Sequence, residues 1–144
     1  MVNLGFGGGA RGEPEVAELI SSLAMSAFIM DYDHNAPDAE FLNKTHEPFF
    51  NIIRKAHPSL PVIIISRPDF DDDPCAAAAR REVIRVTYRN ALNAGDRHVS
   101  LINGQELFGE TDRDACTVDT CHPNDLGFMR MAERIFPVVK QALF

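Results

Sequence analysis

The sequence predicts an α/β protein in which helices cover both faces of a parallel β-sheet, in three layers. Short apolar runs alternate along the chain with segments of helical periodicity, which is the order expected for parallel strands joined by helical crossovers. The clearest run lies at residues 61–66 (Pro-Val-Ile-Ile-Ile-Ser), and its centre is apolar and β-branched, as in a strand covered on both faces. The 144 residues are expected to form a single domain, residues 1–144.

The first expected elements occupy residues 2–30. Residues 2–4 form a short apolar run that we expect to be a strand, and glycines between residues 5 and 9 end it. A helix is expected to begin at residues 13–15 (Glu-Pro-Glu), because proline suits the first turn and acids suit the positive helix end. Residues 27–30 predict the second strand. The apolar residues that follow the helix start at i, i+3, i+4 and i+7 are Val16, Leu19, Ile20 and Leu23.

The alternation continues through the second half of the chain. Residues 38–56 are helical in pattern, with an expected break near Pro48. A second long helix is expected from residue 75 to residue 93 and ends at Gly95, and a strand follows at residues 99–102. The arginines of the second helix share one side, where we expect a solvated face rather than an anion site: Arg80, Arg81, Arg85 and Arg89.

Two segments are expected to be irregular. The loop at residues 67–74 carries four acids, and we expect a solvated loop rather than a calcium site, since calcium needs more ligands at set positions. Residues 103–122 lack periodicity. A last helix is expected to open at Pro123 or Asn124 and to bend at Pro137. The acids of the loop are Asp69, Asp71, Asp72 and Asp73.

The charge balance excludes two classes of partner. Lys and Arg number 14 and Asp and Glu 21, a net charge of −7, and the pI is near 5.1. General nucleic-acid binding needs a basic face that replaces phosphate counterions, and anionic membranes attract basic segments, so we expect no nucleic acid and no membrane as a partner. No apolar run approaches the ~18 residues of a membrane span and no signal peptide is visible, which leaves the compartment undetermined.

The three cysteines do not form a disulfide framework, because their number is odd. Cys116 and Cys121 are close enough in sequence to pair, but two unpaired thiols are the simpler interpretation. Cys116, Cys121 and His122 together raise the question of zinc. Their spacing fits no usual zinc pattern and no fourth ligand is evident, so we expect no metal site.

Groups that can hold an oxyanion follow the expected strands, and in such folds ligands bind at the carboxyl ends of the strands. The glycines at residues 5–9 leave backbone N–H groups open to a ligand, and Asn35 adds an amide donor. Asp119 lies three residues before His122, in the roles of orienter and base of a hydrolytic triad. Each residue also fits a plain structural role, since glycine and asparagine suit turns and His122 with the two residues after it suits a helix entry.

With these residues in place, the sequence resembles the SGNH hydrolases, the GDSL-type esterase/lipase superfamily, over essentially its whole length. Residues 3–13 (Asn-Leu-Gly-Phe-Gly-Gly-Gly-Ala-Arg-Gly-Glu) are similar to the second block of a bacterial branch, Asn-Leu-Gly-Phe-Ser-Gly-Asn-Gly-Arg. Residues 28–35 (Phe-Ile-Met-Asp-Tyr-Asp-His-Asn) resemble the third block, and residues 54–63 resemble the segment that enters the next strand. Residues 119–127 resemble the fifth block, Asp-x-x-His-Pro. The resemblance implies a flavodoxin-like sheet of the SGNH-hydrolase type.

The resemblance also implies an activity, the hydrolysis of small acyl esters through an acyl-enzyme, with carbohydrate deacetylation as one example. His122 would be the general base and Asp119 its partner. The mechanism needs no metal or organic cofactor, and the partner is a small-molecule ester. The other implied residues are the oxyanion donors Gly8 and Asn35 and the substrate-binding residues His34 and Gly7.

One departure from the family pattern is large. The first block, Gly-Asp-Ser, carries the family's nucleophile and has no counterpart in this sequence, so a strand from the middle of the sheet is expected to be missing with it. Only Ser66 among the serines ends a strand at the active face, and the family does not use that position. Three explanations stand: a fragment of a longer protein, which we favour; a degenerate, non-catalytic member; and a homo-oligomer in which subunits exchange elements through exposed sheet edges.

Two further classes of function remain open at this point. One is a binding module that retains the pocket without the chemistry. The other is a phosphate- or nucleotide-binding domain that uses the glycine run. The spacing of these glycines is not Gly-x-Gly-x-x-Gly and no Walker lysine follows them, which makes the second class the poorer one.

Overall fold

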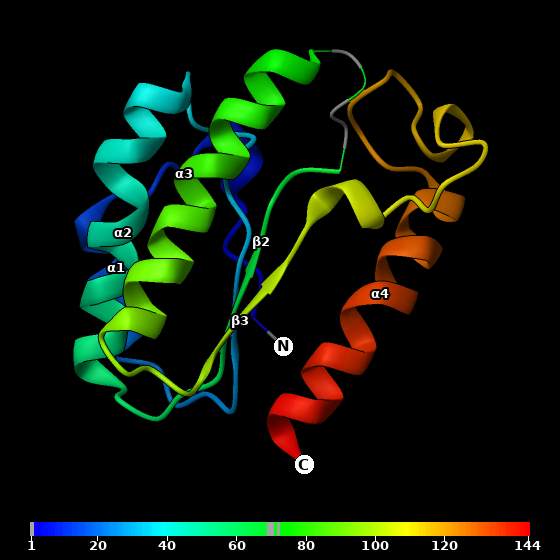
Figure 1. Ribbon diagram of the computed structural model, residues 1–144. Helices are drawn as coiled ribbons and strands as arrows, with labels where there is room; N and C mark the ends of the chain where they lie inside the picture. The colour runs from blue at the N-terminus through cyan, green and yellow to red at the C-terminus, as the bar shows by residue number, and fades with distance from the viewer. Residues whose placement is uncertain (1, 69–70, 72) are drawn as a thin grey trace.

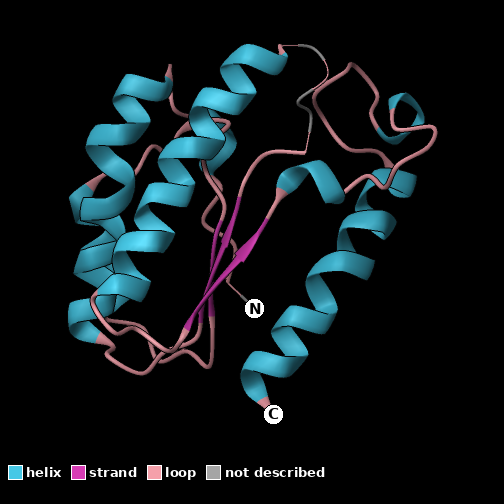
Figure 2. Cartoon of the chain, in the orientation of Figure 1, coloured by secondary structure: helices cyan, strands magenta, loops and turns pink. Residues whose placement is uncertain are grey.

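The computed structural model describes residues 2–68, 71 and 73–144, and these form three layers, helices on both sides of a parallel sheet (Figures 1 and 2). The predicted fold class is confirmed. The strands follow one another in the order β1-β2-β3, with β2 in the centre. In chain order the elements are η1 (Phe6–Gly8), α1 (Pro14–Ser21), β1 (Phe28–Met30), α2 (Ala39–Ala56), β2 (Val62–Ile65), α3 (Pro74–Asn93), β3 (Val99–Ile102), η2 (Gly104–Glu106), η3 (Asp114–Cys116) and α4 (Asp125–Leu143).

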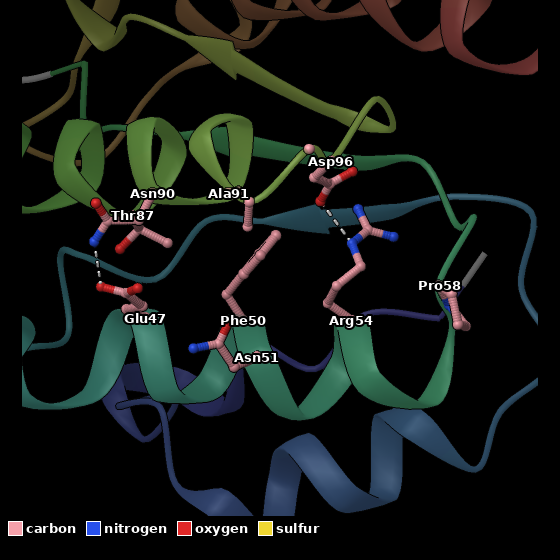
Figure 3. A pocket seen from close by; sticks show the side chains of 11 residues that line it. Glu47, Phe50, Asn51, Arg54, Pro58, Thr87, Asn90, Ala91 and Asp96 are labelled. Atoms are coloured by element: carbon pink, nitrogen blue, oxygen red, sulfur yellow. Dashed lines mark hydrogen bonds and ion pairs between the residues drawn. The ribbon is translucent and has the colours of Figure 1, made fainter.

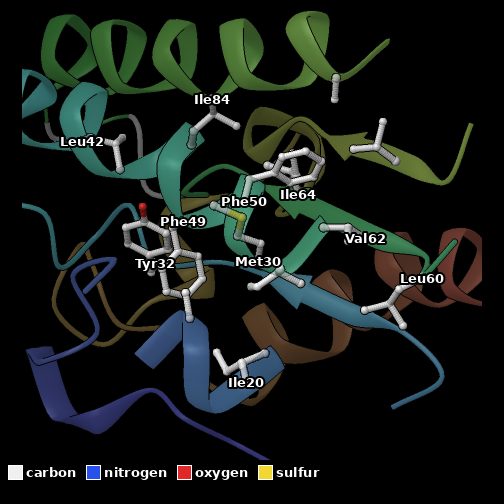
Figure 4. Packing of buried hydrophobic residues seen from close by; sticks show 14 of the residues in the cluster. Ile20, Met30, Tyr32, Leu42, Phe49, Phe50, Leu60, Val62, Ile64 and Ile84 are labelled. Atoms are coloured by element: carbon white, nitrogen blue, oxygen red, sulfur yellow. The ribbon is translucent and has the colours of Figure 1, made fainter. Parts of the chain in front are cut away.

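The two faces of β2 build two separate apolar clusters. Val62 and Ile64 pack with α1, α2 and α3, while Ile63 and Ile65 pack with α4. All four side chains are buried, which is why the strand is apolar throughout rather than alternating. Figure 4 shows the larger cluster, in which Phe49 and Phe50 of α2 reach toward the sheet. β2 is therefore covered by helices on both of its faces.

The strand expected at residues 2–4 is absent, and that prediction is wrong. Residues 2–5 have no regular structure, although Leu4 packs against the larger cluster. A cavity of about 700 Å³ lies between this segment and β1, and its lining includes Val2, Leu4, Ile29 and Met30. A strand exists only where its backbone pairs with a neighbour, and the cavity separates residues 2–4 from the edge of β1 that they would need.

The helices agree more closely with the sequence. The expected break at Pro48 is wrong: α2 continues through this residue, because Phe49, Phe50 and Ile53 beyond it are buried in the larger cluster and hold the helix on the sheet. Gly95 follows α3 with a φ of +86°, as a helix-ending glycine does. In the described parts of the chain, no helix combines the length and the apolar character needed to cross a bilayer.

Arg54 joins the amino-terminal end of the sheet to α2. Its side chain pairs with Asp96 at 2.7 Å and donates to the carbonyl oxygens of His57, Leu60 and His98 at 2.9, 2.7 and 3.2 Å. Arg54 and Asp96 also line a shallow pocket between α2 and α3 (Figure 3). This pocket lies where α2 and α3 end, opposite to the carboxyl ends of the strands, and its charges are already paired, so we assign it a structural role.

We predict that Arg54→Met lowers the free energy of unfolding by about 3–5 kcal/mol, because it leaves Asp96 as a nearly buried charge without its partner. The exposed pair Lys44–Glu40, on the same helix, supplies the matched control. Lys44→Met is expected to cost less than about 1 kcal/mol. Urea denaturation of the two variants measures the difference. Similar losses in both would contradict a structural role for Arg54.

His46 is a buried imidazole inside the helical layer. Its side chain is 2% exposed, its Nδ1 lies 2.8 Å from Thr87 Oγ1, and it stacks against Tyr32. Burial lowers the pKa of His46 from 6.5 to about 4, because the charged form would lose its hydration. The folded protein therefore holds this imidazole neutral.

The pH dependence of stability follows from this shift. The contribution of the neutral His46 is complete above pH 6.5 and is lost as the pH falls toward 4, because the unfolded chain binds the proton first. The difference of 2.5 pH units corresponds to about 3 kcal/mol. We expect the free energy of unfolding of the wild type to fall by about that much more than that of His46→Leu over this range. Denaturant titrations at several pH values measure this. If the free energy of unfolding of the two proteins changed in parallel with pH, the assignment to His46 would be refuted.

Candidate active site

Asp119 and His122 form a hydrogen-bonded pair in the loop before α4. His122 Nδ1 lies 2.7 Å from Asp119 Oδ2, and the backbone N–H of His122 donates to Asp119 Oδ1 at 2.7 Å. The His122 side chain is 76% exposed, so the far side of the ring faces solvent. A carboxylate on Nδ1 fixes the proton at that nitrogen and leaves Nε2 as the basic atom. The pair can therefore orient an imidazole that accepts a proton.

The loop that carries the pair is closed by backbone contacts at its base. Thr117 and Pro123 form an antiparallel bridge, and the N–H of Val118 donates to the carbonyl of His122 at 3.0 Å. Asn124 caps α4 by accepting from the N–H of Gly127 at 3.1 Å. A Cβ on Gly127 would lie 2.2 Å from the carbonyl oxygen of Cys116, so only glycine allows α4 to approach this close. The helix start therefore holds the loop in place.

Asp119 stays ionised at neutral pH. Its pKa lies below the ordinary value of 3.8, first because the backbone N–H of His122 donates to it and next because the His122 side chain does. Hydrogen bonds to the charged form of a carboxyl lower its pKa in this way. The partner of the imidazole is thus an anion that stabilises a positive charge on the ring.

A second loop, residues 31–37 after β1, carries His34 and Asn35. The buried Arg80 holds it by donating to the carbonyl oxygens of Asp33, Ala36 and Pro37 at 2.6, 2.8 and 2.9 Å. Within the described residues, the Asn35 side chain makes no hydrogen bond. Its amide is therefore available to a ligand, on a loop whose backbone is fixed from below.

The expectation that Arg80 lies on a solvated face is wrong, and its role in holding the loop after β1 was not predicted from the sequence. Arg80 is 8% exposed. The same side of α3 holds Ala77, Ile84 and Ala91, which are buried, and this periodicity is the signal that separates Arg80 from its exposed neighbour Arg85. Its partners are backbone carbonyls on a distant loop, which no local pattern reveals.

The same loop contains a buried carboxyl, that of Asp33. It is 1% exposed, its Oδ2 accepts from the N–H of Arg67 at 3.1 Å, and its Oδ1 has no hydrogen-bond partner among the described residues. Burial raises its pKa above 3.8, and His34, Arg67 and Arg80 oppose that rise. Protonation removes the cost of a buried charge without a full set of partners.

The structure brings some of the predicted site residues together and leaves others apart. His34 Nδ1 lies 3.9 Å from the Sγ of Cys121, which places the loop after β1 against the loop of the Asp119–His122 pair. Gly7 and Gly8 are exposed in η1, with φ of +45° and +85°. In the described part of the chain no hydrogen bond joins either glycine to the pair. The roles of all these residues stay predictions.

The remaining candidates give no second site. Ser66 is 1% exposed and its Oγ accepts from the N–H of Gly104 at 2.8 Å, which excludes it as an open nucleophile. Among the described residues none of the three cysteines forms a disulfide. Among the described residues no group of three or more His, Cys, Asp or Glu side chains is placed to hold a metal. The acidic loop lies partly outside these residues, at Asp69 and Asp72, while Asp71 pairs with Arg113.

Comparison with known proteins agrees with the predicted family and fold. A family model described as GDSL-like lipase/acylhydrolase matches residues 1–140. A solved structure from Bacteroides ovatus, described as a GDSL-like lipase, is 27% identical with a TM-score of 0.82 and covers 94% of this chain and 41% of its own. The salicylyl-acyltransferase SsfX3 from a tetracycline biosynthetic pathway, at 21% identity and a TM-score of 0.77, covers 92% and 42% and shows the likeness of fold alone. Among curated proteins no relative matches. The chain thus spans less than half the length of these solved structures.

We predict that Arg80→Met lowers the free energy of unfolding by about 3 kcal/mol, since three carbonyl groups lose a charged donor in a buried place. Arg85→Met, on the exposed side of the same helix, is expected to change it by less than about 0.5 kcal/mol. Hydrogen exchange measured by mass spectrometry is expected to rise in residues 31–37 of Arg80→Met alone. Equal exchange in both variants would show that Arg80 does not hold this loop.

Proposed function

This chain belongs to the GDSL-like lipase/acylhydrolase family, and from that premise we propose that it carries the base and oxyanion half of a serine esterase that cleaves small acyl esters. His122 takes the proton of the attacking hydroxyl and later returns it to the leaving alcohol, while Asp119 holds the imidazole. The Asn35 amide and the backbone N–H of Gly8 would stabilise the oxyanion by donating hydrogen bonds to it. Water then releases the acyl group from the enzyme.

One observation carries the proposal: the 2.7 Å contact between His122 Nδ1 and Asp119 Oδ2, with the imidazole otherwise open to solvent. A histidine placed only for stability is usually enclosed, as His46 is in this protein. An exposed imidazole oriented by an ionised carboxylate contributes little to stability, because surface ion pairs are worth about 0–1 kcal/mol. The arrangement is what general base catalysis needs.

The nucleophile is proposed to come from polypeptide outside residues 1–144. No serine hydroxyl of the described residues contacts His122, and the sequence holds no Gly-Asp-Ser block. The cavity of about 700 Å³ between residues 2–5 and β1 supports this proposal, because it lies beside β1, which is an edge strand of the described sheet. A strand in this cavity would end beside the loop that carries Asn35.

A homo-oligomer is the second proposed source of that strand. In the described sheet β1 pairs with β2 on one side only, and an unpaired strand edge is a template for pairing with another chain. Ile29 on this strand is 44% exposed. Light scattering after size exclusion distinguishes the two sources. Twice the monomer mass of 16.0 kDa would favour exchange between subunits, whereas a folded monomer would count against it.

We predict hydrolysis of 4-nitrophenyl acetate that depends on His122. Even without the serine, an oriented imidazole can activate water or attack this reactive ester, so the wild type is expected to exceed His122→Ala by about tenfold or more. Asp119→Asn should fall between the two, because it removes the anion but keeps a hydrogen-bonding side chain. Ser66→Ala should leave the rate unchanged, since its hydroxyl is buried and bonded to Gly104.

Equal rates for the wild type and His122→Ala would refute the esterase proposal for this chain. The alternative is then a binding module that retains the pocket without the chemistry. The observation in its favour is that no serine hydroxyl of the described residues contacts His122. Loss of activity in Ser66→Ala would show instead that Ser66 takes part in the reaction.

A further inference from the structure

A thiol lies beside the Asp119–His122 pair in contact with another imidazole. Cys121 Sγ is 3.9 Å from His34 Nδ1, within the longer reach of a hydrogen bond that involves sulfur. The two residues are 87 positions apart in sequence. They come from the loop before α4 and the loop after β1, so the contact is made by the tertiary structure and not by local geometry.

The backbone of Cys121 is held by the same carboxylate as His122. Its N–H donates to Asp119 Oδ1 at 3.1 Å, and the N–H of His122 donates to the same oxygen at 2.7 Å. Thr120, between Asp119 and Cys121, has a φ of +68°. This conformation turns the chain sharply before the thiol. Any group attached to Cys121 would therefore sit next to the imidazole of His122.

The other two thiols lack this combination of access and base. Cys116 is 0% exposed, and its Sγ lies near the carbonyl oxygens of Phe108 and Asp112 at 4.0 and 3.8 Å. Cys75 is exposed in the first turn of α3, and among the described residues no imidazole contacts it. Only Cys121, in this part of the chain, is both partly accessible and paired with a histidine.

We propose that Cys121 and His34 form a reactive thiol–imidazole pair that accepts small-molecule disulfides and places a mixed disulfide beside His122. His34 takes the thiol proton, and the Cys121 thiolate attacks one sulfur of the disulfide. A new S–S bond forms, the old one breaks, and the other half leaves as a thiolate. The thiol of Cys121 is oxidised and the incoming disulfide is reduced, so no further oxidant is needed. This inference rests on the contact itself and stands whether or not the chain hydrolyses esters.

The charges around the thiol act in opposite directions. A positive charge on His34 favours the thiolate, as it does in other cysteine–histidine pairs. The carboxylate of Asp119 on the same loop disfavours it, and the imidazole of His122 is the neighbouring titratable group on that loop. Asp33 underneath is held toward its neutral form by burial, which limits its effect on His34.

The test uses Cys75→Ser as the background, so that Cys121 is the accessible thiol, and an aromatic disulfide, 5,5′-dithiobis(2-nitrobenzoate), as the probe. We expect one equivalent to react at pH 6 at least about tenfold faster than glutathione, because free thiols with a pKa near 8.5 are almost fully protonated there. Cys121→Ser in this background should remove the reaction. Peptide mapping should place the adduct on Cys121.

His34→Gln separates activation from a structural effect. It should slow the reaction about tenfold or more at pH 6 but by less than about twofold at pH 9, where the thiol ionises without help. His98→Gln, at an exposed histidine directly before β3 and so at the amino-terminal end of the strands, is the matched control and should change neither rate. A structural effect would change the rates at pH 6 and pH 9 by the same factor. It would also expose Cys116 as a second reacting thiol.

Two results would overturn the proposal. One is a Cys121 rate no greater than that of glutathione from pH 6 to pH 9. The other is the same pH profile for the Cys75→Ser protein with and without His34→Gln. If His34→Gln fails to fold, the comparison of the Cys75→Ser protein with glutathione at pH 6 decides the question alone.

Discussion

The burial of β2 on both faces is the constraint on which the rest of this structure depends. Val62 and Ile64 need the helices α1 to α3 on one side, and Ile63 and Ile65 need α4 on the other. A strand with no polar face is typical of the centre of a layered α/β sheet. Parallel pairing with β1 and β3 then brings all three carboxyl ends to one edge, where the loops that carry the candidate residues must lie.

At that edge the backbone of each loop is anchored by groups of the core or of a neighbouring element. Arg80 fixes the backbone after β1 from a buried position in α3, and the N–H of Gly104 joins the end of β3 to Ser66 at the end of β2. The loop before α4 is tied to its own helix through Asn124. This support does not use the side chain of Asn35 or the solvent-exposed side of the His122 ring. The side chains that lie nearest the solvent are thus carried on backbone that the core has already placed.

The two faces of the sheet are covered unequally. Three helices pack on one face, whereas α4 packs on the other and leaves Phe128 and Phe136 exposed, at 59% and 65%. Ile29 is exposed on the same side of β1, beside the cavity that separates this strand from residues 2–5. Apolar groups in these places gain free energy from any strand or helix that covers them. The uneven cover supports the proposal that further polypeptide completes the sheet and brings the nucleophile.

The sequence by itself determined the fold class, the three strands of the sheet, and the Asp119–His122 spacing, because each rests on a local pattern of apolar residues or on residues three apart. It could not decide whether residues 2–4 form a strand, because that depends on whether a partner edge lies within reach. It also could not separate Arg80 from Arg85, or join His34 to Cys121, because these contacts link segments that are distant along the chain. The tertiary structure decided them through the burial of β2, which sets where every loop ends.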